Sequence, residues 1–345
     1  MRLEIVSKDG KGERWVGAVL CHDLLGEDRH PLLRKGHRLI RDDSFMVEHS
    51  DSPELHLLWL DEGDVDEDTA AIRLARVVAG PGVAVHAPVE SQVRLSAARR
   101  GLASVNVTAL TAINTVAGVT VFTVPDGVPV ERGGTLAGVK ITELAIDGRS
   151  LSAAECCGVT AGEDAGVIHV HPFLPLRVAA VVRERLSDQQ RRRFEDSLRL
   201  RVSWLGGAVA SVRYPAERWS ARDSVLAAVA AADVVIVAGV SSVYPLEGAW
   251  LDLLAAGATV VRRGLPVHPG SSYWVLTLDE VPIIGVASCG MLSRRSALDL
   301  LLPRCFAREP LDGAFLASLG HGGLLQNSGL SRIPSYGGEP EADAW

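Results

Sequence analysis

The run 233–238 constrains the fold of this chain most strongly, because every residue after its first aspartate is aliphatic. A strand with one face in water alternates apolar and polar residues, whereas a strand covered on both faces is apolar throughout. The run ends at Gly239, Ser241 and Ser242 follow in the turn, and residues 247–256 suit a helix. The order strand, turn, helix predicts one unit of a sheet that is covered by helices.

The same alternation of strands and helices extends on both sides of this unit. Further strands are predicted at 176–182, 208–213, 259–262, 273–278 and 281–286, and further helices at 187–204, 220–231 and 293–306. Ser187 has the residue type of an N-cap, and Gly206 and Gly207 are typical of a helix end. This order predicts an α/β fold over 173–308, with a largely parallel sheet flanked by helices.

The remainder of the chain has a different texture. Because 345 residues exceed one ordinary core, two or three domains are expected. Residues 1–60 are predicted to form an N-terminal segment of short strands and loops. Residues 61–172, rich in Val, Thr and Gly after one helix, are predicted to form a β-rich domain. The pattern fades after the last helix, so 309–345 is predicted to be a flexible C-terminal tail.

Composition excludes several classes of function. The net charge of −7 argues against nonspecific binding of nucleic acid. The five cysteines form no Cys-x-x-Cys pair, which predicts a reducing, cytoplasmic location and neither a zinc site nor a disulfide framework. The N-terminus has no apolar signal core, and no run of about 18 apolar residues occurs, so no membrane span is expected.

Small residues at the predicted strand ends indicate a site for an anion. In an open α/β sheet, ligands bind beyond the carboxyl ends of the strands. Backbone amides in turns of small residues suit phosphate groups. One such edge contains the turn 239–242, and a second contains Pro269, Gly270 and Ser271. The turn 239–242 is either a tight strand-to-helix connection without a ligand or, together with the second edge, part of a single cradle of backbone amides for a small anionic ligand.

These turns also carry a resemblance to a known family. The region 174–308 resembles the molybdopterin-binding domain of MoeA- and gephyrin-type molybdotransferases and of the smaller MoaB and Mog proteins. The motif 264–270, Gly-Leu-Pro-Val-His-Pro-Gly, is similar to the Gly-x-Pro-x-x-Pro-Gly loop of that family. The N-terminal motif 17–23, Gly-Ala-Val-Leu-Cys-His-Asp, and the motif 138–141, Gly-Val-Lys-Ile, also find counterparts in MoeA-related chains. The likeness covers about residues 13–308.

The resemblance implies a ligand and a pathway. It implies binding of molybdopterin or its adenylylated form, Mg²⁺ as an assisting ion, a homodimer, and a part in molybdenum-cofactor biosynthesis as a molybdotransferase or a carrier. The implied ligand-binding residues are Gly239, Ser241, Ser242, Pro269, Gly270, Ser271, Ser288 and Arg294.

Several positions depart from the family pattern. The acidic residues expected at the start of the helix are Pro245 and Gly248 here, and Glu247 is the nearest acid. Glu247 is therefore the candidate Mg²⁺ ligand and catalytic carboxylate, or simply an acidic helix start. His268 stands where the family has an acid, and it is either a general acid or base or a loop histidine bonded to backbone. Cys289 is either a nucleophile or a small buried apolar residue.

Three functions remain open from these residues, and with them whether the protein is an enzyme. The first is binding of molybdopterin in cofactor biosynthesis. The second is a repurposed enzyme that acts on another small anionic or nucleotide-like substrate. The third is a structural or interaction role with a vestigial pocket.

Overall fold

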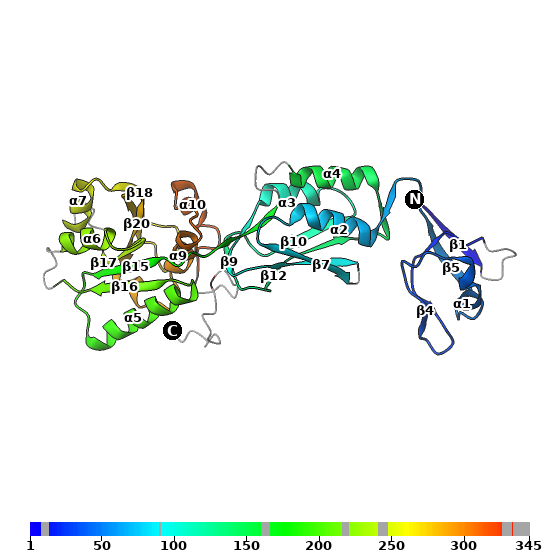
Figure 1. Ribbon diagram of the computed structural model, residues 1–345, viewed down its shortest axis with the longest axis horizontal. Coiled ribbons are helices and arrows are strands. Elements are labelled where there is room, and N and C mark those ends of the chain that lie inside the picture. Colours follow the sequence, from blue (N-terminus) through cyan, green and yellow to red (C-terminus); the bar gives the residue numbers. More distant parts are fainter. Residues whose placement is uncertain are drawn as a thin grey trace. The chain divides into compact units, whose positions relative to one another are not determined.

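The structure is a computed structural model that describes residues 1–7, 14–89, 91–159, 166–215, 221–240, 248–325 and 333. The chain forms two compact units, shown in Figure 1. Unit 1 comprises residues 1–98, 105–124 and 133–169, and unit 2 comprises residues 99–104, 125–132 and 170–345. In the part of the chain that the structure describes, no helix is both long and apolar enough to cross a membrane.

Unit 2 is built on a six-stranded sheet with the order β16-β15-β17-β20-β19-β18. The strands are β15 (Arg177–Val182), β16 (Ala208–Arg213), β17 (Val234–Val240), β18 (Thr259–Arg263), β19 (Trp274–Leu278) and β20 (Val281–Ala287). The first four strands in this order pair in parallel, and the last two join antiparallel. The predicted α/β class is confirmed, and the sheet is mixed.

The antiparallel part of the sheet follows from the link between β19 and β20. Asp279 and Glu280 form this two-residue link, and both have positive φ values, of 49° and 64°. Such a turn matches the twist of a hairpin, and it is too short for the crossover that a parallel pair needs.

β17 is the most buried strand of unit 2, because helices cover both of its faces. Val234, Ile236 and Ala238 pack in one apolar cluster with α5, α9 and α10, and Val235 and Val237 pack in the other with α6 and α7. Figure 1 shows α5 and α6 on opposite sides of this sheet. The helices are α5 (Asp188–Trp204), α6 (Ala221–Val229), α7 (Gly248–Ala255), α8 (Ser288–Met291), α9 (Leu298–Phe306) and α10 (Gly313–Ser318).

Two parts of unit 2 differ from the sequence pattern. The helix predicted over 293–306 begins only at Leu298, after the separate short helix α8. Residues 313–325 lie in the stretch predicted as a tail, yet they contain α10, and Leu316 and Leu325 are buried in the same core as α5. The residues beyond 325, apart from Ile333, lie outside the described part of the chain.

Unit 1 contains a four-stranded antiparallel sheet with the order β10-β12-β8-β7. Its strands and helices are β7 (Val83–Val89), β8 (Gln92–Ala97), β10 (Val119–Thr123), β12 (Thr135–Ile141), α2 (Glu67–Val78), α3 (Val107–Asn114) and α4 (Gly148–Val159). The patterns of Val, Thr and Ala did not predict α3 or α4. The side chain of Asn106 accepts a hydrogen bond from the amide of Ala109 and caps α3. This local hydrogen bond favours the helix, although the Val and Thr residues of α3 prefer strands.

Short strands complete both units. A three-stranded sheet near the N-terminus has the order β1-β5-β2, and the helices η1 and α1 precede β5 in the chain. Three further sheets have the orders β3-β4, β13-β6 and β11-β9-β14. Their bounds are β1 (Arg2–Ser7), β2 (Val19–Leu20), β3 (Leu24–Leu25), β4 (Pro31–Leu33), η1 (Arg41–Asp43), α1 (Ser44–Glu48), β5 (Glu54–Trp59), β6 (Asp64–Asp66), β9 (Gly101–Val105), β11 (Val128–Val130), β13 (Ala145–Asp147) and β14 (Ile168–Pro172).

The start of α5 provides a direct test of the capping analysis. The hydroxyl of Ser187 accepts the amide of Gln190, and the Gln190 side chain accepts the amide of Ser187 in return. We expect Ser187→Ala to lower the free energy of unfolding by about 1 kcal/mol, because the amide of Gln190 loses the hydroxyl that accepts its hydrogen bond. Urea denaturation measures the change. Ser203→Ala, near the other end of α5, serves as the control, and an equal loss there would contradict the assignment.

Candidate functional site

The carboxyl edge of the six-stranded sheet collects the turns that the sequence singled out. Val240 at the end of β17 lies opposite Ala287 at the end of β20. Gly285, two residues earlier in β20, lies opposite Trp274 at the start of β19. The end of β17, the end of β20 and the loop before β19 therefore lie at the same edge, which is where open α/β sheets bind ligands.

β15 adds a charged residue to this edge that the sequence reasoning missed. The amide of Arg183, the first residue after β15, donates to the carbonyl of Ala238 at 2.9 Å. Arg183 is buried, with 6% of its surface exposed. Gly239 has a φ of +78°, and a Cβ there would lie 2.8 Å from the Cβ of Glu184. The sequence signal that could have identified Arg183 is its position as the first charged residue after the buried apolar strand β15.

The loop from Gly264 to Tyr273 connects β18 to β19 and holds four of the predicted site residues. Its own hydrogen bonds close it, since the amide of Gly264 donates to the carbonyl of Tyr273 and the amide of Tyr273 donates to the carbonyl of Gly270, each at 2.9 Å. The peptide bond before Pro269 is cis. Pro269 and Gly270 are buried, whereas Ser271 and the side chain of His268 are exposed.

The C-terminal segment 319–325 holds this loop from the side. The amide of His268 donates to the carbonyl of Gly323 at 2.7 Å, and the amide of Leu325 donates to the carbonyl of His268 at 2.9 Å. The backbone of His268 is therefore committed to the C-terminal segment, and its amide is not available to an anion. The amides of Gly270, Ser271 and Ser272 donate no hydrogen bond to any residue that the structure describes.

The segment after β20 packs directly on the same loop. The amide of Ala297 donates to the carbonyl of Pro269 at 2.9 Å. A Cβ on Gly270, whose φ is +134°, would lie 2.5 Å from the Cβ of Ala297. The fully buried ring of Tyr273 occupies the space where a side chain at Gly290 would stand. Only glycine fits at 270 and 290 without displacing one of these segments.

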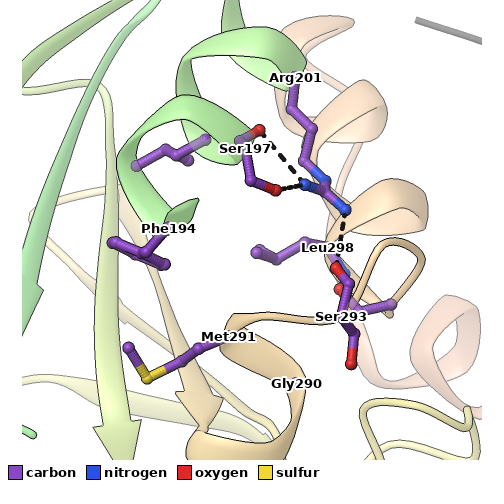
Figure 2. A pocket seen from close by; sticks show the side chains of 9 residues that line it. Phe194, Ser197, Arg201, Gly290, Met291, Ser293 and Leu298 are labelled. Atoms are coloured by element: carbon purple, nitrogen blue, oxygen red, sulfur yellow. Dashed lines mark hydrogen bonds between the residues drawn. The ribbon is translucent and has the colours of Figure 1, made fainter. Parts of the chain in front are cut away.

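A buried ion pair fixes the segment 293–297 in place. Nε of Arg201 on α5 lies 2.7 Å from Oδ1 of Asp299, whose side chain is fully buried. The Oδ2 atom of Asp299 accepts the amide of Ser296 at 2.7 Å. Nη2 of Arg201 donates to the carbonyl of Arg294 at 2.6 Å and contacts that of Ser293, toward which Figure 2 shows it reaching. The guanidinium thus ties α5, this segment and the first turn of α9 together.

A hollow of about 10 Å³ lies between α5 and the segment 290–298. Figure 2 shows its lining, which is formed by Phe194, Ser197, Leu198, Arg201, Gly290, Met291, Ser293, Ser296 and Leu298. This volume has room for about one water molecule. The hollow is therefore too small for a pterin or a nucleotide, and it belongs to the packing around Arg201.

The predicted site residues divide into two groups. Gly239, Pro269, Gly270, Ser271, His268, Ser288 and Arg294 belong to segments that meet at the carboxyl edge. The side chains of Ser288 and Arg294 are exposed there. Ser241, Ser242 and Glu247 lie outside the described residues, as does the side chain of Cys289, whose backbone is part of α8. The roles assigned to all of these residues stay predictions.

The described residues provide few ligands for Mg²⁺ at this edge. Mg²⁺ prefers carboxylate oxygens, and Asp299 is engaged by Arg201. Glu184 is the carboxylate beside Gly239. Among the residues that the structure describes, no group of three or more His, Cys, Asp or Glu side chains could hold a metal ion.

Comparisons with known proteins give only remote likenesses. No family model matches this chain, and no curated protein matches it in sequence. The chain is similar to the solved structure of a molybdenum cofactor biosynthesis protein from Pyrococcus furiosus at 9% identity and a TM-score of 0.24, covering 89% of this chain and 64% of that protein. It thus spans less than two thirds of that protein's length.

Two structures of molybdopterin biosynthesis MoeA proteins from Pyrococcus horikoshii are also similar. Both are 12% identical to this chain. The first has a TM-score of 0.28 and covers 90% of this chain and 76% of the MoeA chain. The second has a TM-score of 0.24 and covers 89% of this chain and 74% of the MoeA chain. Likeness at this level does not establish a function.

The ion pair of Arg201 predicts a large effect on stability. We expect Arg201→Met to lower the free energy of unfolding by about 3–5 kcal/mol, because the buried carboxylate of Asp299 loses the guanidinium that balances its charge. The double variant Arg201→Met with Asp299→Leu is expected to recover most of this loss, since both charges are removed. Urea denaturation measures the cycle. Arg199→Ala on the same helix, whose pair with Glu195 is exposed, is the matched control and should cost less than about 0.5 kcal/mol.

The C-terminal segment predicts a local effect at His268. A Cβ on Gly323 would overlap the carbonyl oxygens of Pro266 and Leu319. We expect Gly323→Ala to push the segment off the loop and to speed hydrogen exchange at the amide of His268, which donates to Gly323. Gly313→Ala is the control, because a Cβ there meets nothing within 4 Å. Unchanged protection of His268 in the Gly323 variant would contradict this role.

Proposed function

We propose that the carboxyl edge of the six-stranded sheet binds a small phosphate-bearing molecule, and that this ligand is molybdopterin or its adenylylated form. The observation that carries the proposal is the meeting of the end of β17, the turn 269–272 and the start of α8 at one edge. The protein would then act in molybdenum-cofactor biosynthesis, as a carrier of the pterin or as a molybdotransferase.

The chemistry of the described residues supports an anion at this edge. The amides of Gly270, Ser271 and Ser272 follow one another in a turn of small residues, where backbone can approach a phosphate closely. Arg294, whose side chain is exposed, brings positive charge to the segment beside this turn, and the buried Arg183 follows the end of β15 next to Ala238. Guanidinium groups pair with phosphate in a bidentate manner.

The identity of the ligand comes from the sequence motifs. The Gly-x-Pro-x-x-Pro-Gly pattern at 264–270 and the Gly-x-Ser turn at 239–241 resemble the molybdopterin-binding family in order and spacing. We include in the proposal a homodimer in a reducing, cytoplasmic compartment, on the same resemblance and on the use of cysteine. Mg²⁺, held by Glu247 with help from the ligand's own phosphate, would neutralise phosphate charge.

A direct titration tests this proposal. Calorimetry of the full-length protein with molybdopterin should give one site per chain with micromolar affinity. We expect Arg294→Gln to weaken binding about tenfold, because a charge-assisted hydrogen bond to phosphate is lost. Arg192→Gln, on the exposed face of α5, is the matched control and should bind like the unaltered protein. No heat of binding at high micromolar concentration would contradict the proposal.

One observation favours a second function, that of an enzyme refitted for another small anionic or nucleotide-like substrate. His268 replaces the acid of the family pattern, and its side chain is exposed at the carboxyl edge while its backbone is held by the C-terminal segment. An exposed imidazole on a loop whose backbone is fixed can act as a general acid or base. Mass spectrometry of the small molecule that co-purifies separates the two functions, since a pterin supports the first and another anion the second.

A further inference from the structure

One face of the four-stranded sheet in unit 1 carries an unusual set of side chains. α2 packs on β7, β8 and β12, and α3 packs on β10, and both lie on the same side of the sheet in Figure 1. Val93 and Val139 point to that covered side and are fully buried. Because side chains alternate along a strand, Phe122, Arg94 and Lys140 belong to the opposite face.

Register places these side chains in two adjacent rows. Phe122 of β10 lies opposite Gly138 of β12, and Gly138 lies opposite Arg94 of β8. In the neighbouring row, Thr120 lies opposite Lys140, and Lys140 lies opposite Gln92. An aromatic ring, two cations and an amide therefore occupy neighbouring positions on one face. We call this set of Phe122, Gly138, Arg94, Lys140 and Gln92 the Phe122 platform.

The absence of a side chain at Gly138 allows the ring of Phe122 to approach the backbone of β12. A Cβ at 138 would overlap the ring carbons of Phe122 and lie 3.0 Å from the Nε2 atom of Gln92. The ring thus covers the glycine backbone, and yet 53% of the surface of Phe122 is exposed. The Cζ and Cε2 atoms of the ring therefore lie over Gly138, and more than half of the side chain remains accessible to a ligand.

The two cations of the platform have no charged partner among the residues that the structure describes. Neither Arg94 nor Lys140 takes part in an ion pair with any of these residues. Arg94 is exposed and Lys140 is half-buried. The chain as a whole carries a charge of −7, and the two platform cations are opposite in sign to that excess.

We propose that the Phe122 platform of unit 1 binds a mononucleotide. The heteroaromatic base stacks on the exposed ring of Phe122, the phosphates pair with Arg94 and Lys140, and the amide of Gln92 hydrogen-bonds the edge of the base. Stacking on an aromatic ring accepts any base. Two cations balance the charge of a nucleoside monophosphate and part of the charge of a triphosphate, whereas a nucleic-acid chain needs a longer basic track.

This site does not depend on the proposed function. Gly138 and Lys140 belong to the sequence motif 138–141, to which the proposed function assigns no role. Their positions on the platform supply that role. Gly138 leaves space for the ring of Phe122, and Lys140 forms an ion pair with the phosphate in the proposed complex.

Titration of the full-length protein with ATP, followed by calorimetry, tests the platform. We expect binding at micromolar to low millimolar concentration, about tenfold weaker in Phe122→Ala and in the double variant Arg94→Gln with Lys140→Gln. Phe122→Trp should retain binding, because the indole also stacks. Phe45→Ala is the matched control, since Phe45 is likewise in unit 1 and is 68% exposed. Circular dichroism and the melting temperature confirm that each variant is folded.

Three results would overturn the proposal. The first is no binding of ATP at 5 mM, or binding that the platform variants leave unchanged. The second is binding of inorganic phosphate as tight as that of ATP, which would indicate charge alone. The third is much tighter binding of a ten-nucleotide dT strand than of ATP, with a steep dependence on salt, which would assign the face to nucleic acid.

Discussion

The pairing of β20 between β17 and β19 is the interaction on which the rest of unit 2 depends. β20 runs parallel to β17, so both strands end at the same edge, and it runs antiparallel to β19, so the loop before β19 returns to that edge. The end of β17, the loop before β19 and the end of β20 therefore meet, although no sequence motif predicts their contact. A slip of one residue would turn every side chain of β20 to the other face. The alternate burial of β17 and β20 in two separate cores opposes such a slip.

Around this edge, contacts between backbone and small residues hold the segments together. Ala297 bonds the carbonyl of Pro269, Gly323 accepts the amide of His268, and Arg201 bonds the carbonyl of Arg294. A buried ion pair contributes little net stability against an apolar replacement, but breaking it is costly. We interpret the pair of Arg201 and Asp299 as a device that gives the segment 293–297 one conformation. That segment would otherwise be free to extend α9 toward its N-terminus, as the sequence pattern predicts.

Sequence periodicity predicted the strands and helices of unit 2 because their burial follows from local order. The apolar run 233–238 became β17, and the cap at Ser187 began α5. Sequence periodicity did not predict contacts between residues that are distant in the sequence. Arg201 and Asp299 are 98 positions apart, and neither residue type signals the other. Gly323 and the C-terminal segment carry no pattern that predicts a bond to His268. In unit 1, the ring of Phe122 over Gly138 depends on strand register, which the strand candidates alone did not specify. Of the candidate site, the sequence predicted the turns but not Arg183 or the packing that shapes them.

The most direct test of the central claim is an amide chemical-shift titration of the ¹⁵N-labelled full-length protein with molybdopterin. If one edge binds the ligand, the amides of Gly239, Gly270, Ser271 and Ser272 move together and report the same dissociation constant. The amide of His268, already bonded to Gly323, moves less. If Gly239 and the turn 270–272 respond at different concentrations, or if neither responds while binding is seen elsewhere, the edge is not a single site and the account is wrong.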